Sequence, residues 1–402
     1  MANTYIGIDS VARKVKQCYI GIDGVARKIK KVYIGVNGIA KLAWQSVITK
    51  LSTWISFENR SKFQTDSGSY HMSGVQDPLV IDDNTCILTC GMRNSDGDFV
   101  GDALAKVTTD DNSNVISVFI EDINDDIMSK CKLGNYYAAG TRSDSGSTYI
   151  HIINFDDTYF SKFTSTNGTI DNIYALNDTT MCGVCNNKNY GTQLFIATFD
   201  GKNAPTVNYV TVVSNATNAR LIHVSGNQYI LFYYLNSAYY LAPLVFNSLS
   251  SYTLGTAINI SNTWLSISTS MSYVIDDNHM VLSTTNGYML GVYIKDNAIS
   301  LSSEMQTNLW RICRIGTSNS FFGFDGSYAT NGIGKIIYYD VSNNSLSVSK
   351  SSISATTFVN NSGYNNVFVQ SSVFVPKLSN KISMFFNSNN DYLYSFDFSF
   401  DV

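Results

Sequence analysis

Two patterns of apolar and polar positions divide the chain. Residues 5–45 hold three near copies of a 14-residue unit, which begin as YIGIDS at Tyr5, YIGIDG at Tyr19 and YIGVNG at Tyr33. From about residue 50 onward, a turn followed by an apolar strand recurs at much longer spacing. The first pattern alternates with the period of two that is typical of β-strands, and the second repeats a turn followed by a short apolar strand. The sequence therefore predicts an all-β protein.

Each short unit predicts a β-hairpin. In the middle copy, residues 19–22 are apolar, Asp23-Gly24 is a strong signal for a type I′ turn, and residues 25–30 alternate. The third copy keeps the turn as Asn37-Gly38, and the first relaxes it to Asp9-Ser10. Because a lone hairpin of this size is marginal in water, we expect the three to form a meander sheet whose apolar side needs a cover from another subunit or protein.

The longer repeat predicts a β-propeller. VIDDNTCILT (80–89) and VIDDNHMVLS (274–283) are close matches, and looser versions bring the number of phrases to seven, 41 to 61 residues apart. This spacing fits one four-stranded blade per phrase. We interpret each phrase as an inner strand, followed by a middle strand such as TQLFIATFDG (192–201) and an outer strand such as VNYVTVVSN (207–215). We expect seven blades, with six or eight as alternatives. The turn residues are Asn84, Asn135, Asp178, Asn227, Asn278, Asn319 and Asn380.

Charge separates the two parts. Residues 1–50 carry nine lysines and arginines against Asp9 and Asp23, a net charge of +7, whereas the remainder has 18 basic and 29 acidic residues, a net charge of −11. The parts therefore differ in surface chemistry and, we expect, in partners. The predicted domains are a basic hairpin module over residues 1–48 and a propeller over residues 49–402.

Composition supports the all-β interpretation and limits the setting. Charged residues are only 14% of the chain, which also has 26 Tyr, 22 Phe and 4 Pro. There is no basic-then-apolar leader, and no apolar run reaches the roughly 18 residues that span a bilayer. The seven cysteines are odd in number and scattered, unlike a secreted disulfide framework. We expect folding in a reducing cytoplasm, without membrane insertion.

The chain offers few candidates for metal or acid–base chemistry. Cys182-x-x-Cys185 has no second pair nearby, so we predict core cysteines rather than a zinc site, with the two thiols on opposite faces of one strand. The acidic stretch at residues 94–98 lacks the closing Glu of a calcium loop and predicts a hairpin tip. Isolated histidines, such as His151, pair with no nucleophile motif. We therefore predict no catalytic residue, no metal site and no cofactor.

One turn resembles a propeller motif. RSDSGSTY (142–149) is similar to the Asp-box, the S-x-D-x-G-x-T-[WF] turn of sialidase-like propellers, although Arg142 stands where Ser is expected. The Asp-box is a structural turn, so the resemblance implies a propeller without locating a catalytic site. Sialidases also need an arginine triad and a Tyr/Glu nucleophile pair. We identify neither set in this sequence, in which arginines are few. The matching residues are Asp144, Gly146, Thr148 and Tyr149.

The tandem hairpins resemble the short N-terminal repeats of structural proteins from tailed phages of Gram-positive bacteria. The shared pattern, Y-I-G-[IV]-[DN]-G-[VI]-A-[RK]-K, covers about 45 of the 402 residues. In those proteins similar repeats precede unrelated C-terminal domains, which implies an attachment module that carries a variable body. The resemblance implies a virion protein made in the bacterial cytoplasm, present in several copies, with tail, baseplate, collar or capsid proteins as partners.

Two modes of attachment stay open. In one, the hairpins dock through basic strand residues; in the other, they dock by strand addition and burial of apolar residues. A solvated meander packed on the propeller is a third interpretation, and nucleic-acid binding is disfavoured because no aromatic residues interleave with the charges. The basic candidates are Arg13, Lys14, Arg27 and Lys28, and the apolar candidates are Ile20, Ile22, Val25 and Ile29.

The role expected of the propeller is non-enzymatic. Loops rich in Tyr, Asn, Ser and Asp suit saccharides, because aromatic rings stack on sugar faces and amides bind hydroxyl groups. Host cell-surface polysaccharide is therefore one expected partner. The same composition suits a purely structural collar, baseplate or capsid-decoration protein. A glycan-cleaving, sialidase-like enzyme is the alternative from another class.

Overall fold

The computed structural model contains strands and turns throughout its described residues. These are residues 5–8, 11–14, 18–22, 25–29, 31–36, 39–45, 61–62, 71–94, 96, 98–109, 115–143, 145–155, 160–187, 189–249, 251–260, 267–284, 287–325, 333–354, 372–376, 381–388 and 392–399. They include no helix, and so none that is long and apolar enough to cross a membrane. The chain forms two compact units, Met1–Thr53 with Phe398–Val402, and Trp54–Asp397.

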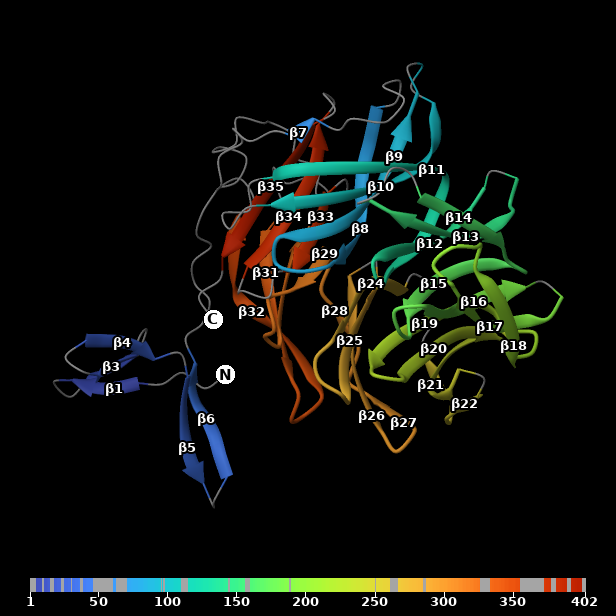
Figure 1. The fold of residues 1–402 in the computed structure, drawn as a ribbon. Helices are drawn as coiled ribbons and strands as arrows, with labels where there is room; N and C mark the ends of the chain where they lie inside the picture. The colour runs from blue at the N-terminus through green and yellow to red at the C-terminus, as the bar shows by residue number, and fades with distance from the viewer. Residues whose placement is uncertain are drawn as a thin grey trace. The chain divides into compact units, whose positions relative to one another are not determined.

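Within the larger unit, the first two blades share a strand (Figure 1). β11 (Val115–Leu133) pairs with β10 (Phe99–Thr109) through residues 115–125, and with β12 (Tyr136–Arg142) through residues 126–133. The strand closes blade one and opens blade two, so that seven strands form one sheet. The remaining strands are β8 (His71–Val80) and β9 (Thr85–Arg93) in blade one, and β13 (Thr148–Asn154) and β14 (Phe160–Ser165) in blade two.

The next four blades are separate antiparallel sheets, each with its strands in chain order. Short extra strands, β23 (Ile258–Ile260) and β28 (Met305–Gln306), pair with the third strands of blades four and five. Blade three is β15 (Thr169–Ala175), β16 (Thr180–Asn187), β17 (Gly191–Thr198) and β18 (Thr206–Val213); blade four is β19 (Thr217–Ser225), β20 (Gln228–Leu235), β21 (Ala238–Ser248) and β22 (Ser251–Leu254); blade five is β24 (Ile267–Val274), β25 (His279–Thr284), β26 (Tyr288–Lys295) and β27 (Ala298–Leu301); blade six is β29 (Leu309–Arg314), β30 (Ser320–Asp325), β31 (Ile333–Asp340) and β32 (Ser345–Ser354).

The seventh blade joins the two ends of the propeller. Its first three strands, β33 (Ser372–Pro376), β34 (Lys381–Ser388) and β35 (Tyr392–Ser399), come from the C-terminal region, and its fourth is β7 (Ser61–Lys62). In Figure 1 the short blue β7 lies beside the red C-terminal strands. This pairing closes the ring between the beginning and the end of the propeller sequence.

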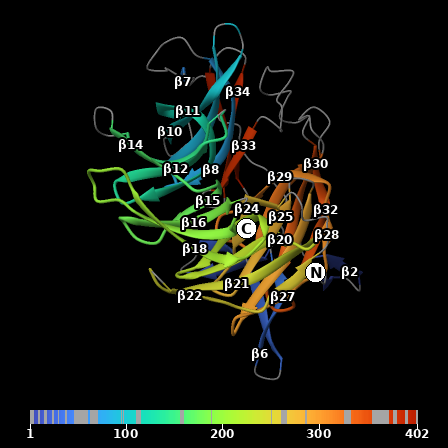
Figure 2. The ribbon, with the colours of Figure 1, turned by 90° about the vertical axis from the view of Figure 1, so that its right-hand side faces the viewer.

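The first strands of the blades surround the propeller axis. They contact one another in the order β8, β11, β15, β19, β24, β29, β33 and back to β8, which completes a ring (Figure 2). The described sheets therefore form a closed seven-bladed β-propeller. The predicted fold class, with seven as the blade number, is confirmed.

The position of the recurring phrase within each blade was predicted wrongly. The phrase strands, such as residues 85–89 in β9 and 279–283 in β25, are second strands. The predicted middle strands are third strands, and the predicted outer strands are fourth strands. The innermost strand precedes each phrase. The innermost strand was missed because it carries polar residues, which interrupt the apolar pattern that marks the other strands.

The hydrophobic core lies between neighbouring blades. Ile230 and Phe232 of blade four pack in one cluster with Met280 and Leu282 of blade five. Full burial of each such side chain contributes about 1.5–3 kcal/mol, so the interfaces between blades supply most of the stability of the ring.

The six cysteines of the propeller are buried in this core. Cys182 packs in the cluster that blade three shares with blade four, whereas Cys185 packs in the cluster shared with blade two. The two thiols of the C-x-x-C sequence therefore lie on opposite faces of β16, as predicted. Burial raises the pKa of both thiols to about 12, so both stay protonated at neutral pH.

In the smaller unit, the N-terminal repeats form three hairpins. Each hairpin is its own two-stranded sheet, so the expected common meander is not present among the described residues. Only one residue separates β4 from β5, which is fewer than the two residues that a tight turn between paired antiparallel strands needs. The strands are β1 (Tyr5–Ile8), β2 (Val11–Lys14), β3 (Cys18–Ile22), β4 (Val25–Ile29), β5 (Lys31–Val36) and β6 (Ile39–Gln45).

Candidate functional site

The recurring phrase builds one type of turn between the first and second strands of a blade. In blade five, Asp276 Oδ1 accepts hydrogen bonds from the backbone amides of Asn278 and His279, both at 2.9 Å. In blade one, Asp82 Oδ1 accepts from the amide of Asn84 at 2.8 Å. These bonds satisfy amides that the tight turn leaves without a strand partner. The first Asp of the phrase is therefore structural.

The Asn of the same phrase connects the turn to the third strand. Its backbone carbonyl accepts a hydrogen bond from an amide near the end of that strand. In blade three the corresponding bond runs from the Phe199 amide to Thr179 O at 2.8 Å. The donors and acceptors are Thr109 to Asn84 (2.7 Å), Phe246 to Asn227 (3.0 Å), Ile294 to Asn278 (2.8 Å) and Tyr339 to Asn319 (2.9 Å).

These turns give one end of the propeller an acidic surface. Because the strands are antiparallel, the turns between strands one and two and between strands three and four lie at the same end of each blade. We call this end the acidic face. Its described turns and strand ends carry eight aspartates against Lys132, Lys202, Lys295 and Lys381, with Arg314 engaged by backbone carbonyls. The aspartates are Asp82, Asp83, Asp178, Asp200, Asp276, Asp277, Asp296 and Asp340.

Hydrogen bonds keep several of these carboxylates ionised. Backbone and side-chain donors of Asn203, together with the Lys202 amide, lower the pKa of Asp200 to about 2. The Ser342 hydroxyl is the main cause that lowers the pKa of Asp340. The described turns at the opposite end carry only Asp96, Asp98 and Glu304, and its strand ends add two acidic and two basic residues, namely Asp126, Asp325, Arg93 and Arg142. Negative charge is therefore concentrated on the acidic face.

A crevice opens on the acidic face between blades four and five. One wall is the start of β20 with the facing part of β21, from Pro243 to Val245. The other wall consists of Asn278, Ile294 and the turn between β26 and β27. The enclosed volume is about 40 Å³, well below the roughly 300–1,000 Å³ of a small-molecule site. The crevice is large enough for a small polar group and is smaller than a typical small-molecule site.

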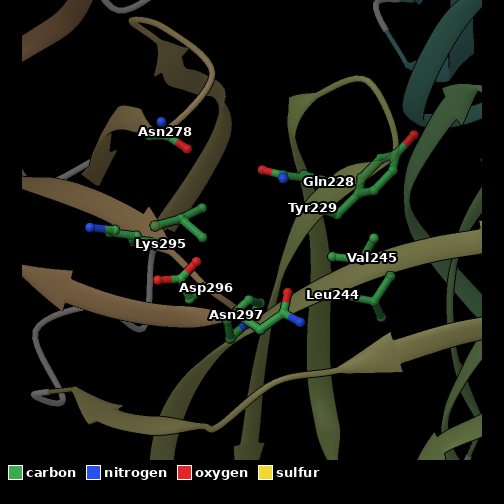
Figure 3. A pocket seen from close by; sticks show the side chains of 10 residues that line it. Gln228, Tyr229, Leu244, Val245, Asn278, Lys295, Asp296 and Asn297 are labelled. Atoms are coloured by element: carbon green, nitrogen blue, oxygen red, sulfur yellow. The ribbon is translucent and has the colours of Figure 1, made fainter.

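Polar side chains line the mouth of the crevice. Figure 3 shows Gln228 directed from its strand toward the opposite wall, which carries Asn278, Asp296 and Asn297. Gln228 Oε1 is buried and has no hydrogen-bond partner in the part of the chain that the structure describes. A buried acceptor without a partner is costly, so this oxygen points to an absent donor.

The shape of the crevice depends on a close approach of two backbones. The Gly255 amide donates to the carbonyl of Pro243 at 2.8 Å. A Cβ at Gly255 would collide with the carbonyl oxygen of Asn297 in blade five and with the Pro243 ring. Asp296 and Asn297 adopt left-handed φ angles of 51° and 58°, which Asn and Asp tolerate in a two-residue turn. Glycine on one side and an Asp-Asn turn on the other hold the blades together here.

The Asp-box-like stretch forms the turn between β12 and β13. The Ser143 amide donates to Ser147 O at 2.8 Å, and Gly146 adopts a φ of 81°. Thr148 Oγ1 donates to Gly168 O at 2.7 Å and thereby holds the connection to blade three. The Tyr149 ring lies edge-on against Phe163, with centroids 5.7 Å apart. Asp144 lies outside the described residues.

Two of the described arginines, Arg142 and Arg314, lie at opposite ends of the propeller. Arg142 Nη2 pairs with Asp126 Oδ2 at 3.0 Å, at the end of a second strand. Arg314 stands at the end of a first strand, at the opposite end of the propeller, and donates to Thr317 O at 2.8 Å and Ser318 O at 2.7 Å. Two arginines at opposite ends, each with its own acceptors, cannot hold one carboxylate substrate together.

Other candidate groups have structural partners. Asn94 Oδ1 accepts from the amides of Asp96 (3.0 Å) and Asp98 (2.9 Å), which is the geometry of a hairpin tip. His151 stacks on Phe163, with ring centroids 5.4 Å apart, and burial lowers the pKa of its imidazole. Within the described residues, no group of three or more His, Cys, Asp or Glu side chains is placed to hold a metal ion.

The register of the hairpins sorts the candidate docking residues onto two faces. Ile20 pairs with Arg27 and Ile22 with Val25, so these positions share one face together with Ile29, which pairs with Cys18. Lys28 pairs with Tyr19 on the other face. The first hairpin has the same register, with Arg13 opposite Ile6 and Lys14 opposite Tyr5. The predicted basic residues therefore do not form a single basic face.

The crevice residues other than Asn278 were not identified from the sequence. Asn278 was singled out as a turn residue, and it lines the crevice as well. The Asp296-Asn297 pair between two apolar strands is a recognisable turn signal. Gln228 follows another turn residue, Asn227, but no local pattern shows that two blades bring Gln228 and Asp296 together.

Comparison with known proteins finds similarity only at the level of fold. No family model and no curated protein matches the chain. The β-propeller domain of Cps50 (Swd1) from Myceliophteria thermophila shares 8% identity over 81% of this chain and 98% of that chain, with a TM-score of 0.49. The WD40 β-propeller domain of Doa1 shares 12% over 82% and 97%, with a TM-score of 0.43. A functionally unknown protein from Desulfotomaculum acetoxidans shares 11% over 67% and 83%, with a TM-score of 0.47.

Proposed function

We propose that this chain is a structural protein of a tailed-phage particle, in which the hairpin repeats attach the chain and the propeller is the displayed body. The observation that carries the proposal is the shared register of the three hairpins, which places corresponding repeat residues at corresponding positions. Tandem copies of one docking unit bind through avidity, so weak single contacts are enough. The resemblance of the repeats to phage attachment repeats supplies the type of assembly.

For the propeller we propose contacts with host-surface polysaccharide or with neighbouring subunits, without catalysis. Support comes from the size of the crevice, about 40 Å³, and from the engagement of Arg142 and Arg314 by other protein groups. The turns instead offer amide, hydroxyl and carboxylate groups over a broad face, which suits binding to another surface.

Occupancy on purified particles tests the attachment role. Three double variants separate the modes of docking: Arg13→Glu with Arg27→Glu, Lys14→Glu with Lys28→Glu, and Ile20→Asp with Ile29→Asp. Docking through charge lowers occupancy in both Glu pairs, because two reversals cost a few kcal/mol and weaken binding about 10- to 100-fold. Docking through the apolar face predicts the largest loss of occupancy for Ile20→Asp with Ile29→Asp. Full occupancy by all three variants would refute an anchor in residues 1–48.

Binding and hydrolysis assays test the role of the propeller. If the propeller contacts the host surface, the full-length protein should bind isolated host cell-wall polysaccharide. If it contacts neighbouring subunits, it should bind only other particle proteins. In both cases it should release no sugar from sialosides or from that polysaccharide. Release of sugar by the purified protein would replace the binding role with the alternative of a glycan-cleaving enzyme.

A further inference from the structure

We propose that the crevice between blades four and five receives a lysine ammonium from the hairpin repeats of a second copy of this chain, so that copies dock head to tail through the acidic face. The inference rests on the proposed role of the repeats as docking elements and names one partner for them. It starts from Gln228, whose buried Oε1 lacks a hydrogen-bond donor in the described part of the chain. An ammonium group is all donor and has no acceptor to leave unsatisfied.

The size of the crevice favours a compact cation. Its enclosed volume of about 40 Å³ exceeds the roughly 10–15 Å³ that one water-sized group needs, but it cannot take a sugar ring. The Tyr229 ring packs against Phe246, with centroids 5.3 Å apart, in the cluster between blades three and four, so it offers no stacking platform here. A lysine carries its charge as a small group on a slender stem, which fits a narrow opening.

The charge around the crevice also favours a cation. Asp296 lies at its mouth, and the facing turn carries Asp276 and Asp277 beside Asn278. Lys295 is exposed, and Figure 3 shows it directed away from Gln228. The remaining aspartates of the acidic face extend this negative field across several blades, and fields of this kind steer and orient a basic partner.

The complementary surface is present in the chain itself. Residues 1–50 have a net charge of +7, and seven of their nine cations are lysines. Because the donor and the acceptor lie in different parts of the chain, each copy can give one contact and receive one. Such a heterologous contact produces rings or open rows of subunits, in keeping with several copies per particle. The lysines are Lys14, Lys16, Lys28, Lys30, Lys31, Lys41 and Lys50.

Sedimentation velocity of the full-length protein tests the proposal. We expect concentration-dependent association at 50 mM salt that weakens at 500 mM, because exposed charges are screened over shorter distances. Reversal of two exposed carboxylates, Asp178→Lys with Asp296→Lys, should weaken association at least about tenfold. The matched control, Asp96→Lys with Asp98→Lys, makes the same change of net charge at the other end and should leave association within about twofold of the parent.

Gln228→Leu separates insertion into the crevice from general attraction between charges. The substitution removes a buried acceptor that lacks a partner, so the fold should be as stable as the parent or more stable. Association should nevertheless weaken by about threefold or more, because the inserted ammonium loses its acceptor. Parent-like association of this variant, or monomeric full-length protein at 50 mM salt, would overturn the proposal.

A peptide identifies the occupant. Residues 17–32, added in trans, should compete with association, and the same peptide with Lys28, Lys30 and Lys31 changed to Gln should compete at least about fivefold less well. Equal competition by both peptides would exclude a lysine as the inserted group. Particle occupancy keeps the two proposals apart: loss of occupancy in the hairpin variants with no self-association would refute this inference and leave the attachment role standing.

Discussion

At the scale of single residues, side-chain acceptors decide how the turns and strand crossings form. Asp102 is 5% exposed, and its Oδ2 accepts a hydrogen bond from the Ile127 amide at 2.8 Å, just after β11 passes from blade one to blade two. Burial raises the pKa of this carboxyl to about 6. The ionised Asp102 carboxylate therefore destabilises the fold at neutral pH. Its hydrogen bond with the Ile127 amide nevertheless holds β11 where the strand passes between the two blades.

Asp102→Asn should remove part of the pH dependence of folding. Because the folded pKa lies above the unfolded value near 3.8, the stabilisation is complete below about pH 4 and is lost as the pH rises through about 6. A shift of about two units corresponds to up to about 3 kcal/mol between pH 4 and pH 7. Urea unfolding of the parent and of Asp102→Asn at pH 4.5 and 7 measures how the free energy of unfolding changes with pH. Equal losses of stability in parent and variant over this range would contradict the assignment.

Asn177 allows a matched test of the turns. Its Oδ1 accepts from the amides of Thr179 and Thr180, both at 2.9 Å, in the turn that opens β16. Asn177→Ala should lower the free energy of unfolding by about 1 kcal/mol, whereas Asn177→Asp keeps the acceptor and should cost little. Urea midpoints compare the two variants. An Asp variant as unstable as the Ala variant would mean that the hydrogen bonds do not stabilise the turn.

At the scale of elements, the sequence predicted the strands that follow its phrases and missed the innermost ones. β15 contains Asp171 and Asn172, which break the apolar alternation. Asn186, in the same blade, donates to Asp171; its side chain also donates to Ala219 O and accepts from the Ala219 amide at 2.9 Å in blade four. One polar side chain near the axis thus bonds both within its blade and to the next blade, and no pattern local to one strand predicts such bonds. The crevice was missed for the same reason.

Gly183 shows how closely the strands of one blade approach. A Cβ at this position in β16 would collide with the carbonyl oxygen of Asn172 and come within 2.6 Å of the Phe195 ring. Gly183→Ala should therefore destabilise the propeller by at least about 2 kcal/mol. The control is Gly226→Asn, at an open turn position with a φ of 52°, which should cost less than about 1 kcal/mol. Thermal unfolding of both variants checks the ranking, and similar losses would contradict close packing as the cause.

At the scale of the whole molecule, the closure of the ring depends on two residues that the sequence pattern gave no reason to notice. Ser61 and Lys62 pair with Leu393 and Tyr392, more than 300 residues away. The spacing of the phrases predicted seven blades, because each turn repeats within its own blade. The spacing did not predict that the last blade takes its outer strand from the region just after the hairpins, since a two-residue strand has no periodicity to detect.

Two truncations test this closure. Removal of residues 1–48 keeps β7, so the propeller should unfold cooperatively at nearly the melting temperature of the full chain. Removal of residues 1–64 deletes β7, which leaves the edge of β35 unpaired and frees the N-terminal end of the ring. A loss of about 2 kcal/mol lowers the melting temperature of a large domain by several degrees, and exposure of the strand edge should promote aggregation. Calorimetry with light scattering measures both effects. If the two truncated proteins melt at the same temperature, the β7–β35 pairing does not hold the ring closed, and the contacts between β33 and β8 are sufficient.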